Sequence, residues 1–214
     1  MPKETFLNLS EEKQELIMRA AIDEFMNRGY EKGNIGDIAK AAGVAKGSMY
    51  QYFENKKELF LYSVKWAMEL VMKKYNKVML TDVKDINIFD YLYESSKETW
   101  QQMREEREVI IFIQDVFLGK YNNVKDETMN YMLKVMDDYT LRLIRDGKKN
   151  GYIRTDVDDN ILAMFITGAS IKMKEYIMNK ARNAGDNLID ETFEANESEF
   201  KSMIDLIKNG MGAK

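Results

Sequence analysis

Apolar side chains return every three or four residues along most of the chain, which is the spacing of amphipathic α-helices. A first helix is predicted from Ser10, whose hydroxyl can cap its N-terminus, to Gly29, which can end it. The apolar stripe of this helix is expected to contain Leu16, Ile17, Ala20, Ala21 and Phe25. Through this stripe the helix is expected to pack across the two helices that follow.

Two short helices joined by a turn are predicted next, between residues 34 and 54. The apolar positions of this pair are Ile35, Ile38, Ala39, Ala42, Val44, Met49 and Phe53. Gly43 interrupts the pattern, and glycine can adopt the left-handed conformation that ends a helix. Ala39 is small enough for the second helix to cross the first closely. This helix-turn-helix spacing predicts a DNA-reading unit, although the spacing alone also fits an ordinary helical hairpin.

Six further helices are predicted, so the expected fold is all-α with about nine helices. Their approximate ranges are 55–78, 88–103, 109–118, 125–150, 157–182 and 197–209. The polar stretches 81–87 and 183–199 are expected to connect helices, and the charged cluster 104–108 to be a solvated loop or a helix start. We therefore expect two domains: an N-terminal three-helix domain over residues 1–54 and a larger helical domain over residues 55–214.

Composition narrows the chemistry open to the chain. It has 32 basic and 36 acidic residues and a net charge of −4. From Lys32 to Lys57 five lysines stand against two acids, so this stretch carries +3 and the remainder −7. Positive charge is thus concentrated where DNA binding is predicted. Cysteine and histidine are absent, which excludes disulfides, thiolate chemistry and imidazole metal sites, and no cofactor or metal is expected.

Neither a membrane partner nor an enzymatic activity is expected. The longest apolar runs, 109–113 and 161–166, are far shorter than the roughly 18 residues that span a bilayer, and the N-terminus does not read as a signal peptide. A cytoplasmic location is therefore expected. Adjacent carboxylates such as Glu105 and Glu106 point to different sides of a helix, so they do not converge on a substrate.

The outer face of the second short helix carries donors and aromatic edges suited to DNA. Its residues are Lys46, Gly47, Ser48, Tyr50, Gln51 and Tyr52. The helix N-terminus offers amides and partial positive charge to a phosphate, and Gly47 has no side chain to keep the DNA away. This helix lacks arginine, so Gln51 is expected to pair with an adenine and Lys46 to contact a guanine less directionally. The expected phosphate contacts are Tyr50, Tyr52 and Lys56.

Residues 10 to 62 closely resemble the N-terminal domain of the tetracycline-repressor (TetR) family of transcriptional regulators. The residues that match the family pattern are Phe25, Gly29, Tyr30, Ile38, Ala39, Ala42, Gly43, Val44, Gly47, Ser48 (for a threonine), Tyr50, Phe53, Lys56, Glu58 and Leu59. Three positions depart from it. Gly33 and Asn34 replace a hydroxyl pair, Ala45 replaces the serine that caps the recognition helix, and Tyr52 replaces a histidine. Asn34 can still cap its helix and remains a DNA-binding candidate.

The resemblance implies a ligand-responsive DNA-binding regulator, usually a repressor, that binds a palindromic double-stranded operator as a homodimer. A small hydrophobic effector would release the operator by a small movement of the helix 55–78. The residues expected to line the effector pocket are Trp66, Tyr93, Trp100, Met103, Phe112, Asp115, Phe117 and Phe165. Those expected in the dimer interface are Met164, Gly168, Ile171, Phe200, Met203, Ile204 and Ile207.

Other interpretations stay open at this point. Bulky apolar residues at helical spacing are also what an ordinary core contains, and this applies to both the pocket and the interface candidates. The alternative function is a helical ligand-binding or scaffold protein without DNA-binding activity. A salt titration distinguishes the two, because a regulator loses duplex affinity steeply as salt rises and a scaffold has none to lose.

Overall fold

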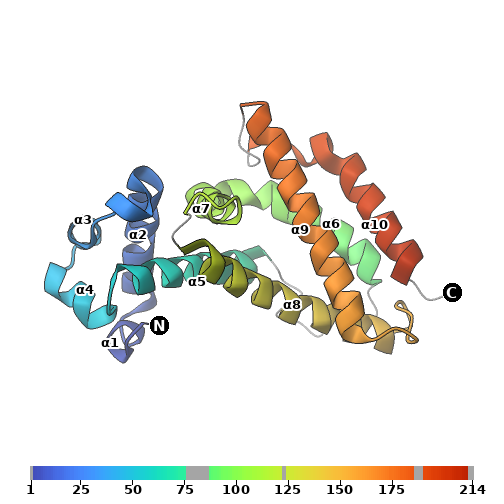
Figure 1. Cartoon of the computed structure of the whole chain (residues 1–214), viewed down its shortest axis with the longest axis horizontal. Coiled ribbons are helices and arrows are strands. Elements are labelled where there is room, and N and C mark those ends of the chain that lie inside the picture. The colour runs from blue at the N-terminus through green and yellow to red at the C-terminus, as the bar shows by residue number, and fades with distance from the viewer. Residues whose placement is uncertain (1, 76–86, 122–123, 186–189, 212–214) are drawn as a thin grey trace. The chain divides into compact units, whose positions relative to one another are not determined.

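The computed structural model of the chain describes residues 2–75, 87–121, 124–185 and 190–211. These residues form α-helices and short 3₁₀ turns and contain no strand, which confirms the all-α prediction (Figure 1). In chain order the helices are α1 (Glu4–Leu7), α2 (Glu11–Lys32), α3 (Ile35–Ala41), α4 (Lys46–Tyr52), α5 (Lys56–Tyr75), α6 (Ile88–Gln102), η2 (Met103–Glu106), α7 (Arg107–Phe117), α8 (Lys125–Lys149), α9 (Asp159–Asn183), η5 (Phe193–Asn196) and α10 (Glu197–Met211).

Local sequence signals set most of these boundaries. The Ser10 hydroxyl accepts a hydrogen bond from the Lys13 amide at 3.3 Å and begins α2 where predicted. Gly29 has a φ of 73°, so the regular part of α2 ends there and only a last turn follows. The four-residue helix α1 is absent from the sequence prediction. The predicted end of the helix 55–78, and most of the expected connection 81–87, lie outside the described residues.

The chain packs into two compact units that do not follow the expected division at residue 54. The first unit combines the chain up to Leu70 with Glu108–Tyr131, and the second combines Val71–Arg107 with Met132–Lys214. Helices α5 and α8 therefore each contribute to both units, and the first residue of α7, Arg107, belongs to the second unit while the rest of that helix belongs to the first. The functional division into residues 1–54 and 55–214 stays a prediction.

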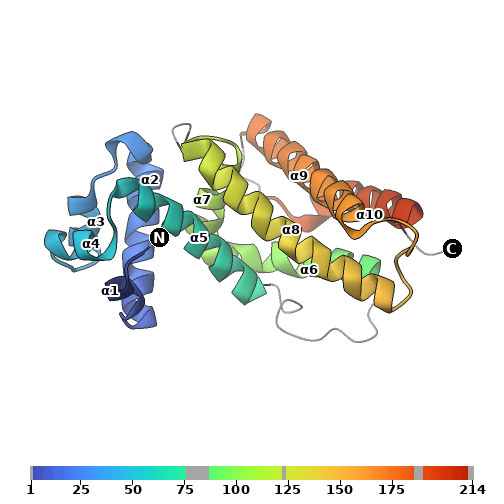
Figure 2. The same ribbon diagram turned by 60° about the horizontal axis from the view of Figure 1, so that its bottom comes forward.

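In the first unit, α2 packs on α3, and α3 packs on α4 (Figures 1 and 2). The buried side chains of these helices are Ile17, Met18, Ala21, Ile22, Phe25, Ile38, Ala39 and Met49. Gly43, with a φ of 64°, ends α3 in the left-handed conformation that the sequence predicts for it. These contacts confirm the helix-turn-helix arrangement.

An aromatic cluster joins these helices to α7. Phe60 of α5 is fully buried, and its ring centroid lies 5.0 Å from Phe25, 5.2 Å from Tyr30, 5.7 Å from Phe112 and 5.0 Å from Tyr121. All four of these pairs are edge to face, which is a favourable geometry for aromatic rings. Burial raises the pKa of both Tyr30 and Tyr121 above the usual range of a phenol. The cluster is thus an aromatic core that links α2, α5 and α7.

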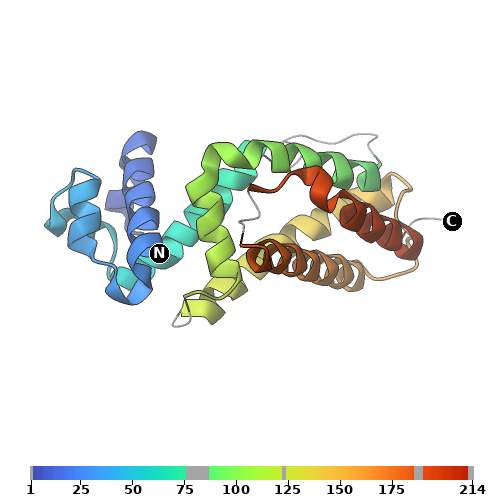
Figure 3. The same ribbon diagram turned by 90° about the horizontal axis from the view of Figure 1, so that it is seen from above.

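In the second unit, α10 packs against both α6 and α9 (Figures 1 and 3). One core cluster collects side chains from α6, α8, α9 and α10, with Phe89, Ile144, Ile166 and Ile207 among its buried members. A second cluster lies around Trp100, whose Nε1 donates to the Glu191 carbonyl at 3.0 Å. No helix within the described ranges has an apolar stretch long enough to cross a membrane.

The charged cluster 104–108 forms η2 and the first turn of α7, so the expectation of a helix start is confirmed. It is not wholly solvated, however. Glu106 is buried and accepts a hydrogen bond from Lys74 at 3.0 Å, and Arg107 forms a bidentate pair with Asp190. These ion pairs bind the cluster to the rest of the second unit.

Candidate DNA-binding site

Helix α4 turns one face to the core and the other to solvent. Met49 is buried against the rest of the unit, and Phe53, directly after the helix, is buried too. Among the predicted DNA-binding residues of this helix, Lys46, Gly47, Tyr50 and Gln51 are exposed, and Ser48 and Tyr52 are half-buried. The residue types expected to contact DNA therefore lie together on the outward side of a two-turn helix.

Two of the candidates meet at the N-terminus of α3. The Asn34 side chain accepts a hydrogen bond from the Gly36 amide at 2.7 Å, so it caps α3 as predicted. A Cβ atom placed on Gly36 would lie 3.5 Å from Cδ of Lys46. The stem of Lys46 thus runs past Gly36, beside the Asn34 cap. Asn34 and Lys46 thus lie close together, and a phosphate contact by either of them remains a prediction.

Lys56 has partners within the protein. Its ammonium group donates to the carbonyls of Glu31 at 2.8 Å and Gly33 at 3.3 Å, and it lies 5.0 Å from the centre of the Tyr30 ring. These contacts attach the start of α5 to the end of α2. A phosphate contact by Lys56 remains a prediction, and its observed contacts are all structural.

The N-terminus of α4 has no side-chain cap. Ala45 occupies the cap position with φ −68° and ψ 141°, a conformation that a capping serine also adopts. We expect Ala45→Ser to raise the free energy of unfolding by about 1 kcal/mol, because its hydroxyl would accept from a free amide of the first turn.

Urea denaturation followed by circular dichroism measures the change in stability. Ala41→Ser, an exposed position within α3, is the matched control and is expected to cost about 0.5 kcal/mol or less. Equal changes in the free energy of unfolding in the two variants would show that a side-chain cap at the N-terminus of α4 adds no stability.

The expected effector-pocket residues are distributed over both units. Phe112 and Phe117 are buried in the first unit, where Asp115 forms an ion pair with Lys120 at 2.6 Å. Trp66 of the same unit lies under the guanidinium group of Arg19, 5.7 Å from its carbon. This unit therefore brings four of the candidates into one compact body, but Asp115 and Trp66 already have partners there.

The remaining pocket candidates belong to the second unit. Trp100 is buried and packs against Phe193 and the half-buried Phe200. Tyr93 donates a hydrogen bond to Glu197, which raises the pKa of Tyr93. Phe165 is half exposed on α9. The side chain of Met103 lies outside what the structure describes.

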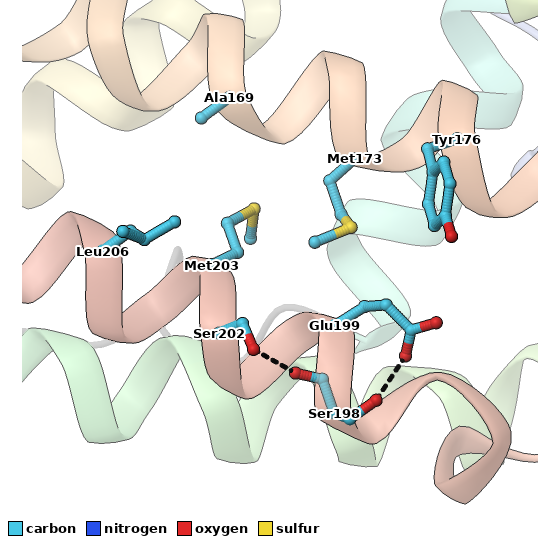
Figure 4. Close-up of a pocket in the computed structure, with 8 residues that line it drawn as sticks. All are labelled: Ala169, Met173, Tyr176, Ser198, Glu199, Ser202, Met203 and Leu206. Carbon is cyan, nitrogen blue, oxygen red and sulfur yellow. Dashed lines mark hydrogen bonds between the residues drawn. The ribbon is translucent and has the colours of Figure 1, made fainter.

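Helices α9 and α10 border a shallow groove of about 530 Å³ (Figure 4). Its lining residues are Ala169, Met173, Tyr176, Ser198, Glu199, Ser202, Met203 and Leu206. A hydrogen bond from Lys180 at 2.9 Å and another from Ser198 lower the pKa of Glu199 to about 2. Only Met203 belongs to a predicted set, that of the dimer interface.

The dimer-interface candidates fall on two different faces. Met164 is 69% exposed and Gly168 is exposed, whereas Ile171, Met203 and Ile204 are half-buried. Ile207 is only 2% exposed and packs in the core of its own unit, so its side chain is not available to a partner. The half-buried Phe200 packs internally against Trp100 and Phe193.

The exposed apolar residues of α9 and α10 include several that were not among the predicted interface residues. They are Ile161, Tyr176 and Leu206, and also Phe165, which was assigned to the pocket. Where exposed apolar side chains gather on one surface, they mark an interaction site on many proteins. A second omission is Lys3 and Thr5, which lie against the last turn of α4. A four-residue helix is too short to show a hydrophobic period, so no signal in the sequence indicates it.

Comparison with known proteins places this geometry in context. Residues 17–62 match the family model described as bacterial regulatory proteins, tetR family. The biofilm operon icaADBC HTH-type negative transcriptional regulator IcaR of Staphylococcus aureus is 26% identical over 143 residues, which cover 63% of this chain and 75% of IcaR.

Solved structures extend the likeness to the whole chain. A TetR family transcriptional regulator from Chloroflexus aurantiacus has a TM-score of 0.59 and 25% identity, with all of both chains covered. The transcriptional regulator FadR from Bacillus subtilis, in complex with stearoyl-CoA, has a TM-score of 0.60 and 19% identity, with 92% of this chain and 98% of that one covered.

Proposed function

The chain belongs to the TetR family of bacterial regulatory proteins, and we propose that it is a homodimeric repressor that releases a palindromic operator when a small hydrophobic effector binds. The observation that carries this proposal is the outward face of α4. It presents Lys46, Gly47, Tyr50 and Gln51 to solvent on a helix whose opposite side is buried. A helix of this size fits the major groove, where glutamine can pair with adenine.

Two copies of this helix are needed to define a site. One helix of two turns covers few base pairs, whereas two helices related by a two-fold axis read both halves of a palindrome in successive major grooves. The exposed apolar residues of α9 and α10 support a symmetric interface through which the dimer would form. In this proposal Met164, Phe165 and Leu206 contribute to it, and Ile207 stays in the core.

The effector and the direction of regulation are inferred from relatives. IcaR is named as a negative regulator, and FadR of Bacillus subtilis was solved with stearoyl-CoA, which carries a long apolar chain. The 16 methionines of this chain suit a pocket that adapts to apolar ligands, because the thioether side chain is flexible and polarizable. We infer an effector with a substantial apolar part, binding in the larger domain and acting in the cytoplasm, where the operator lies.

The alternative, a helical ligand-binding or scaffold protein, leaves the exposed donors of α4 without a role. We also assign no catalytic function to the chain. Within the described ranges, no cluster of three or more acidic side chains is arranged to hold a metal ion.

A change at Gln51 tests the proposed reading of DNA. The wild-type protein is first used to select binding duplexes from a randomised library, and affinities are then measured by fluorescence anisotropy at several salt concentrations. We expect Gln51→Ala to abolish the preference for adenine at one position of each half-site, a loss of about 1–3 kcal/mol of discrimination per bidentate pair.

Lys40→Gln is the matched control, because Lys40 is exposed on α3, outside α4, and its replacement removes one positive charge. It is expected to weaken all duplexes about equally and to flatten the salt dependence. An unchanged base preference in Gln51→Ala would contradict the assignment of Gln51. A wild-type protein with no salt-dependent duplex affinity would favour the scaffold alternative.

A further inference from the structure

The C-terminal end of α4 is capped by residues that precede α2. A helix ends with carbonyl groups that have no amide partner within the helix. In α4 the Met49 carbonyl accepts from the Phe53 amide at 2.9 Å, which leaves the next three carbonyls to be satisfied. All three accept hydrogen bonds from residues 2–7, which we call the N-terminal clip.

The clip supplies one donor to each carbonyl. The Lys3 ammonium group donates to the carbonyl of Tyr50 at 2.9 Å, and the Lys3 amide donates to the carbonyl of Tyr52 at 2.9 Å. The Thr5 hydroxyl donates to the carbonyl of Gln51. Two residues thus complete the hydrogen bonding of the last turn of α4.

The clip is itself held firmly in the unit. Phe6 is fully buried, with its ring 4.9 Å from that of Phe53 and 5.4 Å from that of Tyr62. The Gln14 side chain of α2 donates to the carbonyls of Leu7 at 3.2 Å and Leu9 at 3.0 Å. The donors of Lys3 and Thr5 are therefore presented from a packed segment and not from a loose end.

Helix α4 depends on such outside support. It has only seven residues, and helices this short are not stable in water on their own. Its N-terminus has no side-chain cap, so its interior contacts and the clip hold it in place. The three carbonyls that the clip binds belong to the residues whose side chains are expected to face DNA.

We propose that the N-terminal clip positions the recognition helix, with Lys3 and Thr5 as positioning residues for DNA reading. Their hydrogen bonds fix the last turn of α4, and with it the direction in which Tyr50 and Gln51 leave the helix. The inference rests on the proposed function, in which α4 enters the major groove. A misplacement of this turn would reduce discrimination between bases, because paired hydrogen bonds to a base edge need defined geometry.

Thr5→Val tests the proposal, because valine has nearly the shape of threonine and no donor. The full-length variant is assayed against the duplex that the wild-type protein selects from a randomised library and against the same duplex with the adenine opposite Gln51 replaced. We expect a threefold to tenfold loss of affinity, the size of about one hydrogen bond, and a smaller ratio between the two duplexes. Faster hydrogen exchange of the Phe53 amide, at an unchanged melting temperature, is expected to accompany the loss.

Three further variants make the outcome specific. Thr5→Ser keeps the donor and is expected to restore wild-type binding, and Leu16→Ala, an exposed position of α2 outside the clip, is expected to have no effect. Thr5→Val carries no charge change, so its salt dependence is expected to match the wild type. Lys3→Met is compared with Thr5→Val in the same assay. If only Lys3→Met weakens DNA binding, and if it also flattens the salt dependence, then Lys3 contacts a phosphate and the proposal is wrong.

Wild-type affinity in Thr5→Val would equally overturn the positioning role. Failure of the proposed function would give a different result from failure of the positioning role. In that case the wild-type protein would bind no duplex, or Gln51→Ala would keep its base preference, while the exchange rate of the Phe53 amide would still report whether the clip holds α4.

Discussion

Phe60→Ala is expected to lower the free energy of unfolding by about 4 kcal/mol. Truncation of a fully buried phenylalanine removes its transfer free energy and leaves a cavity, which together cost about 3–5 kcal/mol. Phe60 also contacts four aromatic rings, and edge-to-face pairs add to the loss. Because these rings belong to α2, α7 and the segment after α7, the surroundings cannot collapse into the cavity without moving several helices.

Urea denaturation at a fixed protein concentration measures this loss, since a dimer's stability depends on concentration. The matched control is Leu16→Ala on α2, where the side chain is 48% exposed and the cost is expected to stay near 0.5 kcal/mol. A loss below about 2 kcal/mol for Phe60→Ala would show that the cluster repacks freely around the cavity, which contradicts the expectation.

Met164→Asp is expected to convert the proposed dimer into monomers and to reduce operator affinity by more than about a hundredfold. Met164 is 69% exposed on α9, so the monomer loses little stability when it is replaced. In a symmetric interface the same substitution occurs twice, and each buried carboxylate without a partner costs several kcal/mol. A monomer presents one recognition helix and cannot bind both half-sites at once.

Sedimentation velocity reports the oligomeric state, and anisotropy with the selected duplex reports the affinity. Leu16→Asp introduces the same charge at an exposed apolar position of α2 and is expected to leave the dimer intact. A dimeric Met164→Asp protein that binds DNA normally would remove the α9–α10 face from the interface.

The DNA-binding end of the chain was the most accessible to prediction from sequence. Its signals are local: Ser10 and Asn34 cap helices through their own side chains, and Gly43 needs a left-handed backbone. Each of these signals acts on residues close to it in the sequence, so the sequence alone is enough to predict the helix boundary that it sets. The two departures from the family pattern at Asn34 and Ala45 also led to correct predictions. In the structure Asn34 caps α3, and α4, which begins after Ala45, has no side-chain cap.

Contacts between segments far apart in the sequence could not be predicted in this way. The clip joins Lys3 to Tyr50, and Lys56 binds carbonyls at the end of α2, and neither pairing follows from a local pattern. An apolar stripe likewise predicts burial without naming the partner that provides it. Ile207 lies on the stripe that the unit's own core occupies, whereas its neighbour Leu206 points outward and was missed.

The same ambiguity explains the pocket candidates. Phe112, Trp100 and Phe165 are all bulky residues at helical spacing, yet one is fully buried in the first unit, one packs in the second, and one is half exposed. The sequence fits each of these outcomes equally well. Only the packing of the folded chain distinguishes them.

The boundary between the two compact units crosses the chain at Leu70–Val71, Arg107–Glu108 and Tyr131–Met132, and each crossing falls inside a helix. Both units are therefore built from segments that lie far apart in the sequence. A chain cut after α5 would lack residues 108–131, which belong to the first unit, so neither unit can be obtained as one continuous fragment.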